Sequence, residues 1–294
     1  MDEKHRLWHK HAKEIASIVS VASAETRDEY VQRAQKAAQD LTPEQLTNLP
    51  KFFHDNRPDI PQDQAERFEG FSGSIDWMAA VQRAIFAIYR FCPDVSLPIV
   101  RDIAFGVYDW TQITALETLC VFARAGIERE QIVEEITDAI PRFRREALMP
   151  AISYVSSVGY AHPKLIQLLE KYIHEETQGG DPVDAMRFIT GLAKVDRESG
   201  KKYELLLHDL MNGKGLEDRP PILDGAVVND SGEAVSWGRS GPPPAQIHQI
   251  NAALLLWYLF PEDKEALDNL KDWQMNHPDE QIRKSLQYRL KDEN

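Results

Sequence analysis

Three segments of the sequence, spaced 33 residues apart, share one apolar pattern: IVRDIAFGV (residues 99–107), IVEEITDAI (132–140) and LIQLLEKYI (165–173). In each segment the first, second, fifth and ninth residues are large and aliphatic. That interval places the four side chains on one face of an α-helix. The pattern therefore predicts three copies of the same helix.

A second predicted helix precedes each segment and keeps the same spacing. Its apolar positions are Phe86, Leu119 and Ile152; Tyr89, Phe122 and Val155; and Cys92, Ala125 and Val158. The residues that follow the last set are Pro93, Gly126 and Gly159, which are residue types that end helices. Each repeat is therefore a helix, a tight turn and a second helix. Because such a unit cannot bury its apolar face alone, we expect neighbouring units to stack into a solenoid.

A period of 33 residues also suits tetratricopeptide and ankyrin repeats, but the signature residues of both are absent. The segment NHPDEQIRKSL (276–286) resembles the Pro-Asp-x-x-Val-Arg opening of a HEAT helix. The chain resembles HEAT-repeat proteins over roughly residues 75–212 and 245–290. The resemblance implies an all-α solenoid of antiparallel helix pairs, and it implies no particular function.

The segments between and around the repeats complete the predicted organisation. We expect a single continuous solenoid with four parts: an N-terminal helical cap (1–70), HEAT-like helix pairs (71–212), an irregular insertion (213–244), and a C-terminal repeat and cap (245–294). The insertion is rich in glycine and proline. Two short apolar runs in it flank Asn229-Asp230-Ser231-Gly232, which predicts a β-hairpin.

Two helix starts are visible in the sequence. Thr42 is expected to cap a helix that has Pro43 at its first position and Gln45 closing a capping box. Asp109 and Gln112 predict a second box of the same kind. These boundaries support the helical assignment independently of the apolar pattern.

The composition limits the class of partner. The chain carries a net charge of -13, from 47 acidic and 34 basic residues. Nucleic acids and anionic membranes are bound through Lys and Arg, so we expect neither as a partner. The longest apolar run, residues 252–260, is too short to span a bilayer. With only two cysteines and no apolar leader segment, a cytoplasmic location is expected.

The sequence contains no motif of a known catalytic, metal or cofactor site, so we expect a non-enzymatic protein without a cofactor. His5 and His9 have helical spacing but lack further ligands, and a solvated polar face explains them better. His174-Glu175 is similar to one pair of the HEAT-repeat iron hydroxylases, which need several pairs. A buried Asp109 beside Trp110 would suit a HEAT-like DNA glycosylase, whereas a helix cap explains Asp109 without one.

The remaining signal is surface charge. In HEAT-like arrays the second helix of each pair lines the concave side, which places an acidic strip there. The expected partner-binding residues lie in this strip and in the insertion: Arg101, Glu130, Glu134, Glu135, Asp138, Gln167, Trp237 and Arg239. An electronegative strip would attract a basic protein, and Trp and Arg are the types that dominate interfaces. An ordinary solvated face explains the strip as well.

The expected function is a non-catalytic protein–protein interaction module, such as an adaptor, an inhibitor or an immunity-type binding protein. Two alternatives stay open. One is a HEAT-like enzyme (lyase, hydroxylase or glycosylase) whose site the sequence does not reveal. The other is a structural subunit of a larger assembly.

Overall fold

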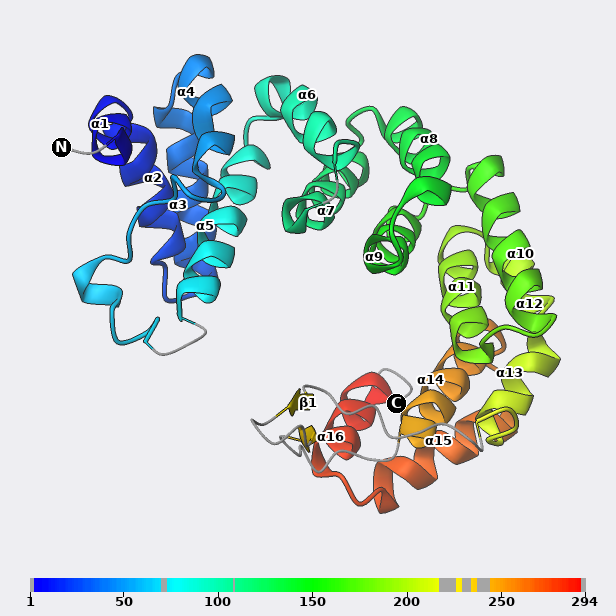
Figure 1. The fold of residues 1–294 in the computed structure, drawn as a ribbon. Coiled ribbons are helices and arrows are strands. Elements are labelled where there is room, and N and C mark those ends of the chain that lie inside the picture. Colours follow the sequence, from blue (N-terminus) through cyan, green and yellow to red (C-terminus); the bar gives the residue numbers. More distant parts are fainter. Residues whose placement is uncertain are drawn as a thin grey trace. The chain divides into compact units, whose positions relative to one another are not determined.

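The computed structural model describes residues 3–69, 73–107, 109–216, 226–228, 234–236 and 244–291. In this part of the chain sixteen α-helices account for most of the residues, which confirms the predicted all-α class (Figure 1). The chain divides into two compact units, Met1–His162 and Pro163–Asn294. The division falls inside the third sequence repeat. No helix in the described ranges is both long and apolar enough to cross a membrane.

The first unit begins with four helices that precede the repeats. Its α-helices are α1 (Glu3–Lys10), α2 (Ala12–Ala22), α3 (Arg27–Asp40), α4 (Pro43–Asn48), α5 (Gly73–Tyr89), α6 (Pro93–Ala104), α7 (Trp110–Arg124), α8 (Arg129–Ala139) and α9 (Arg145–Ser156). Helix α5 packs against α2 and α3, and α7 packs against α6, α8 and α9. Two large buried side chains of this core donate hydrogen bonds to backbone carbonyls. Trp77 Nε1 donates to the Pro58 carbonyl at 2.7 Å, and the Tyr89 hydroxyl donates to the Leu46 carbonyl at 3.0 Å.

The helix ends show why the repeat has its period. Gly126 and Gly159 have positive φ angles of 89° and 67°, the left-handed conformation that glycine adopts at low cost. After α7, the Ile127 amide donates to the Phe122 carbonyl at 3.0 Å, which completes a glycine-based helix end. Val107 departs from the prediction. Helix α6 ends at Ala104, so Val107 lies beyond it and is 93% exposed.

Both predicted helix caps are present. Thr42 and Gln45 form the complete capping box at the start of α4. Asp109 Oδ1 accepts from the Thr111 and Gln112 amides at the start of α7. The reciprocal half of this second box is absent: Gln112 Oε1 accepts from no described donor, while its Nε2 donates to the Ala104 carbonyl at 3.1 Å.

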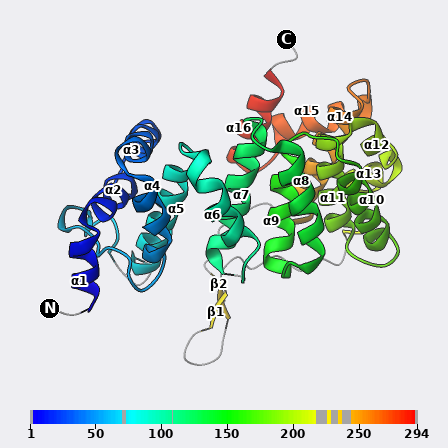
Figure 2. The same ribbon diagram turned by 90° about the horizontal axis from the view of Figure 1, so that it is seen from above.

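The second unit packs its helices around α14. Its helices are α10 (Pro163–Thr177), α11 (Pro182–Val195), α12 (Arg197–Lys201), α13 (Glu204–Met211), α14 (Pro244–Leu259), α15 (Lys264–Asn276) and α16 (Glu280–Arg289). Helix α14 packs against α11, α12, α13 and α15, and α16 packs against α15 (Figure 2). A short strand pair, β1 (Ala226–Val228) and β2 (Ala234–Ser236), is antiparallel, with Val227 opposite Val235. The residues that join these strands lie outside the described ranges.

The second half of helix α14, residues 252–259, is apolar on all sides, unlike a helix with a single buried face. Ala252, Ala253 and Leu256 are fully buried. Ile247 and Tyr258 on the same helix are 40% and 49% exposed. The helix therefore has more apolar surface than its neighbours cover, and this surplus surface borders the site described next.

Candidate functional site

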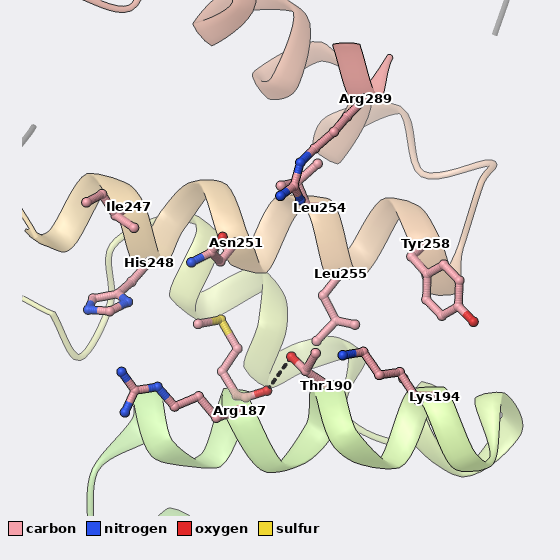
Figure 3. A pocket seen from close by; sticks show the side chains of 12 residues that line it. Arg187, Thr190, Lys194, Ile247, His248, Asn251, Leu254, Leu255, Tyr258 and Arg289 are labelled. Carbon is pink, nitrogen blue, oxygen red and sulfur yellow. Dashed lines mark hydrogen bonds between the residues drawn. The ribbon is translucent and has the colours of Figure 1, made fainter. Parts of the chain in front are cut away.

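A groove with a volume of about 610 Å³ lies between α11 and α14 (Figure 3). Helix α11 contributes Met186, Arg187, Thr190, Ala193 and Lys194; α14 contributes Ile247, His248, Asn251, Leu254, Leu255 and Tyr258; and α16 contributes Arg289. A second hollow of about 500 Å³ shares Leu254, Tyr258 and Arg289 with the first and adds Arg197, Trp257 and Pro261. We call the two hollows together the basic groove.

The walls of the basic groove follow directly from helix geometry. On α11 the lining residues follow Met186 by one, four, seven and eight positions. On α14 the lining residues follow Ile247 by the same intervals. Residues at such intervals share one face of a helix. Ile247 and Tyr258 lie at the two ends of the α14 wall, and about 1.5 Å of rise per residue makes that wall roughly 16 Å long. The site is therefore an elongated groove.

The groove surface combines apolar and cationic side chains. Met186, Ala193 and Leu255 are buried beneath it, and the exposed parts of Ile247 and Tyr258 border it. None of the described residues that line it is acidic. In a chain whose net charge is -13, this local composition is the reverse of the average surface.

The cations of the groove differ in what they bind. Arg187 forms an ion pair with Asp184 at 2.8 Å. Arg197 donates to the Tyr258 and Leu259 carbonyls at the end of α14, and its guanidinium carbon lies 5.1 Å from the centre of the Tyr258 ring. Both are held by the protein itself.

Lys194 and Arg289 are different. Both are exposed, and neither forms a hydrogen bond or an ion pair with the part of the chain that the structure describes. In Figure 3, Lys194 extends from α11 toward α14, and Arg289 extends from α16 toward Leu254. Two cations that contact no charged or hydrogen-bonding group of the described chain thus lie beside an apolar surface. This arrangement can bind a ligand that carries carboxylates or other anionic groups next to apolar ones.

The predicted acidic strip is organised around Arg101 in the first unit. Arg101 Nε lies 2.8 Å from Glu135 Oε2, and Arg101 Nη2 lies 2.7 Å from Glu128 Oε2. The other oxygen of Glu135 accepts from Gln131 Nε2 at 2.8 Å. Although partial burial alone would lower the pKa of Arg101, the hydrogen bonds to Glu128 and Glu135 raise it. We predicted from the sequence that Arg101 and Glu135 belong to the same strip, and this prediction did not include Glu128.

The other predicted site residues are dispersed. Glu130 and Asp138 are exposed and Glu134 is half-buried on α8, and both Glu134 and Asp138 have interactions within the protein. Gln167 is exposed on α10, in the second unit. The remaining two, Trp237 and Arg239, lie outside the described residues.

The structure does not support the residues that the sequence suggested as parts of an enzyme site. The Asp109 side chain is 41% exposed and Trp110 is 71% exposed, so the buried Asp required by the glycosylase hypothesis is absent at this position. His174 and Glu175 are both exposed on α10. His9 is exposed on α1, as expected for a solvated polar face, whereas the neighbouring His11 is buried and lies 2.9 Å from Glu14.

Sequence reasoning missed the basic groove. Its residues come mainly from α11 and α14, which are about sixty positions apart in the sequence, with Arg289 from α16 and Arg197 from α12, and no motif joins them. One signal was present: α14 has apolar residues on more faces than one packing interface requires. A helix of that kind must either be buried all round or leave apolar surface for a ligand.

No protein-family model, no curated protein and no solved structure matches the chain. The resemblance to HEAT-repeat proteins therefore depends on the residues quoted for it, and the architecture beyond the helical class stays a prediction.

Proposed function

We propose that the chain is a non-catalytic protein-interaction module whose basic groove binds an acidic, amphipathic helical segment of another protein. The observation that carries this proposal is the pair of cations Lys194 and Arg289, which bind none of the described residues and lie beside exposed apolar surface on α14. The scaffold in this proposal is a solenoid of HEAT-like helix pairs with a β-hairpin insertion. Sequential packing of neighbouring helices within each unit and the antiparallel β1–β2 pair support that scaffold.

The shape of the groove favours a helical segment as its occupant. An amphipathic helix binds a groove through apolar residues at three- and four-residue intervals over two to three turns. The α14 wall is three helical turns long, which matches this length. Acidic residues beside the apolar positions of the ligand would lie near Lys194 and Arg289, where they would also increase the association rate.

The role of such a module remains the one expected from the sequence: an adaptor, an inhibitor or an immunity-type protein. Because Cys92 and Cys120 are free thiols, we include a cytoplasmic location in the proposal. Binding of a basic partner to the acidic strip is a second candidate, but Arg101 and Gln131 already occupy Glu135, which weakens it. Trp237 and Arg239 stay predicted contacts.

A pair of labelled peptides tests the proposal. The first is a fluorescein-labelled amphipathic helix with Leu on one face and Glu on the flanking positions, and the second has Lys in place of each Glu. Fluorescence anisotropy should give a dissociation constant for the acidic peptide at least about tenfold lower than for the basic one, because the basic peptide meets like charge. Equal affinity for the two peptides would refute the proposal.

Charge reversal then assigns the site. The variant Lys194→Glu/Arg289→Glu should lose the preference for the acidic peptide. A matched control, Lys264→Glu/Lys271→Glu, changes the same charge on exposed positions of α15 and should retain it. Because Glu at the end of α16 opposes the helix dipole, Lys194→Gln/Arg289→Gln serves as a second variant, and circular dichroism confirms that each protein is folded. Loss of binding in the control alone would place the site elsewhere.

A further inference from the structure

Helix α13 and the start of α15 bring together three side chains that are typical metal ligands. Glu204, His208 and Asp263 each offer one ligand atom, and these atoms all lie within 4.8 Å of one another. Glu204 and His208 are four positions apart on α13, so both lie on the same face of the helix. No other group of three or more such ligands occurs in the described ranges of the chain.

The protein holds two of these ligands in place through their other atoms. Asp263 caps α15, with its Oδ1 accepting from the Ala266 amide at 3.0 Å, which leaves Oδ2 free to lie 2.9 Å from His208 Nε2. On the opposite side of the imidazole ring, Nδ1 lies 3.3 Å from Glu265 Oε2. The other oxygen of Glu265 accepts from Asn212 at 3.1 Å.

This arrangement has the features of a histidine that binds a metal. In metal sites the second ring nitrogen of a ligating histidine donates to a carboxylate, which fixes the ring orientation. Glu265 has that position here. Glu204 has no hydrogen-bond or ion-pair partner among the described residues, so its carboxylate is available to a ligand.

We propose that Glu204, His208 and Asp263 bind one divalent cation of the zinc class, with Glu265 orienting His208. One imidazole nitrogen and two carboxylate oxygens suit Zn²⁺, whereas Mg²⁺ and Ca²⁺ prefer oxygen ligands alone. Ligand atoms at about 2.0–2.1 Å from a tetrahedral ion lie roughly 3.3 Å apart. The present spacing of 2.9 to 4.8 Å therefore requires only side-chain adjustment.

The site would join two helices that are distant in the sequence. The Asp263 side chain is 10% exposed and that of His208 is 24% exposed, while Glu204 is exposed. The ion would thus lie at the surface end of the α13–α15 junction, with one coordination position accessible to water. Its role is to fix α15 against α13. This inference is independent of the basic groove.

Isothermal titration of the chelator-treated full chain with ZnCl₂ tests the site directly. We expect one ion per chain, with Co²⁺ giving the visible absorption of a four-coordinate nitrogen–oxygen site and Mg²⁺ giving no heat. The variant His208→Ala should weaken Zn²⁺ binding at least about 100-fold, and Glu265→Gln about tenfold, as removal of an outer-shell carboxylate does. Asp263→Asn should also weaken binding while it retains the helix cap.

Two controls make the result decisive. His54 and Asp109 form a similar pair at 3.2 Å with no third ligand among the described residues, so His54→Ala should bind Zn²⁺ like the unchanged chain. His9→Ala removes an exposed N-terminal histidine and should also have no effect. Absence of stoichiometric binding, or affinity that is unchanged in His208→Ala, would overturn the proposal, as would equally tight binding of Mg²⁺.

Discussion

The acidic strip of the first unit and the basic groove of the second carry opposite charges, and they differ even more in how those charges are satisfied. In the strip, Arg101 binds two carboxylates, and one of these is also bound by Gln131. In the groove, Lys194 and Arg289 bind no described residue. A charge that is already paired contributes little to a partner, because binding must first replace the existing contact. We infer that the few cations that bind no described residue, rather than the more numerous paired carboxylates, indicate a surface that binds a partner.

The largest expected effect concerns the apolar side chains beneath the two surfaces. Ile136, under the strip, is fully buried, and Ile136→Ala should destabilise the first unit by about 3–4 kcal/mol. Leu255 lines the groove, so the cavity that Leu255→Ala leaves would open to solvent. This variant should therefore destabilise the second unit by less, about 2 kcal/mol. Urea denaturation followed by circular dichroism measures both. A larger cost for Leu255→Ala would mean that the groove is closed by tighter packing than described.

Reversing the charge of the acidic strip should change the affinity for the acidic peptide much less than neutralising a cation of the basic groove. We expect Glu134→Lys/Glu135→Lys/Asp138→Lys to change the affinity for the acidic peptide less than about twofold. Lys194→Gln alone should weaken it about threefold to tenfold, as expected for a single exposed ion pair of roughly 1 kcal/mol. Anisotropy titrations at two salt concentrations check this, since screening should reduce the contribution of Lys194. An equal effect of both changes would remove the distinction between the two surfaces.

Arg101 should contribute to the stability of the first unit rather than to binding. The variant Arg101→Ala leaves Glu128 and Glu135 without their shared cation and should destabilise the unit by about 1 kcal/mol. The rate at which buried Cys120 is labelled by a thiol reagent should then increase about fivefold, the factor that corresponds to this free energy. Glu135→Gln in the Arg101→Ala background should recover part of the loss. Unchanged labelling would show that the ion pairs contribute nothing measurable.

The same thiols give a pH-dependent test of the first unit. Burial raises the pKa of Cys92 to about 11 and that of Cys120 to about 12. Because the thiolate is the reactive form, both should be labelled slowly in the folded protein at pH 8, and the labelling rate should increase with pH up to those values. Cys92, which is half-buried, should react before Cys120. Rapid labelling of Cys120 at pH 8 would contradict the described burial.

The smallest effect is expected at Glu128, which has a positive φ of 41°. Glu128→Gly should relieve about 1 kcal/mol of left-handed strain. It should also remove an exposed ion pair with Arg101 that is worth about 0.5–1 kcal/mol. The free energy of unfolding should therefore change by less than about 0.5 kcal/mol in urea titrations. A large destabilisation would show that the Arg101–Glu128 contact is stronger than its exposure suggests.

The sequence predicted the helical class because helix periodicity and helix ends are local properties. Phe86, Leu119 and Ile152 are all buried, and Gly126 and Gly159 both have positive φ. The prediction that Val107 lies on the buried helix face was wrong, because α6 ends at Ala104, before this residue. Charge pairing is not local. Whether Glu135 is free or bound depends on Arg101, which is 34 positions away in another helix.

The matching intervals of the lining residues on α11 and α14 limit how the sequence of the basic groove can evolve. Each wall of the basic groove depends on side chains that recur on one face, so a single inserted residue would rotate the rest of that wall by about 100°. Substitutions such as Ile247→Leu would retain the groove, whereas an insertion or deletion between Met186 and Lys194 would remove half of it at once. Descendants of this chain could therefore exchange many of the residues in both walls and still bind, provided that the lengths of α11 and α14 between their lining residues stay constant.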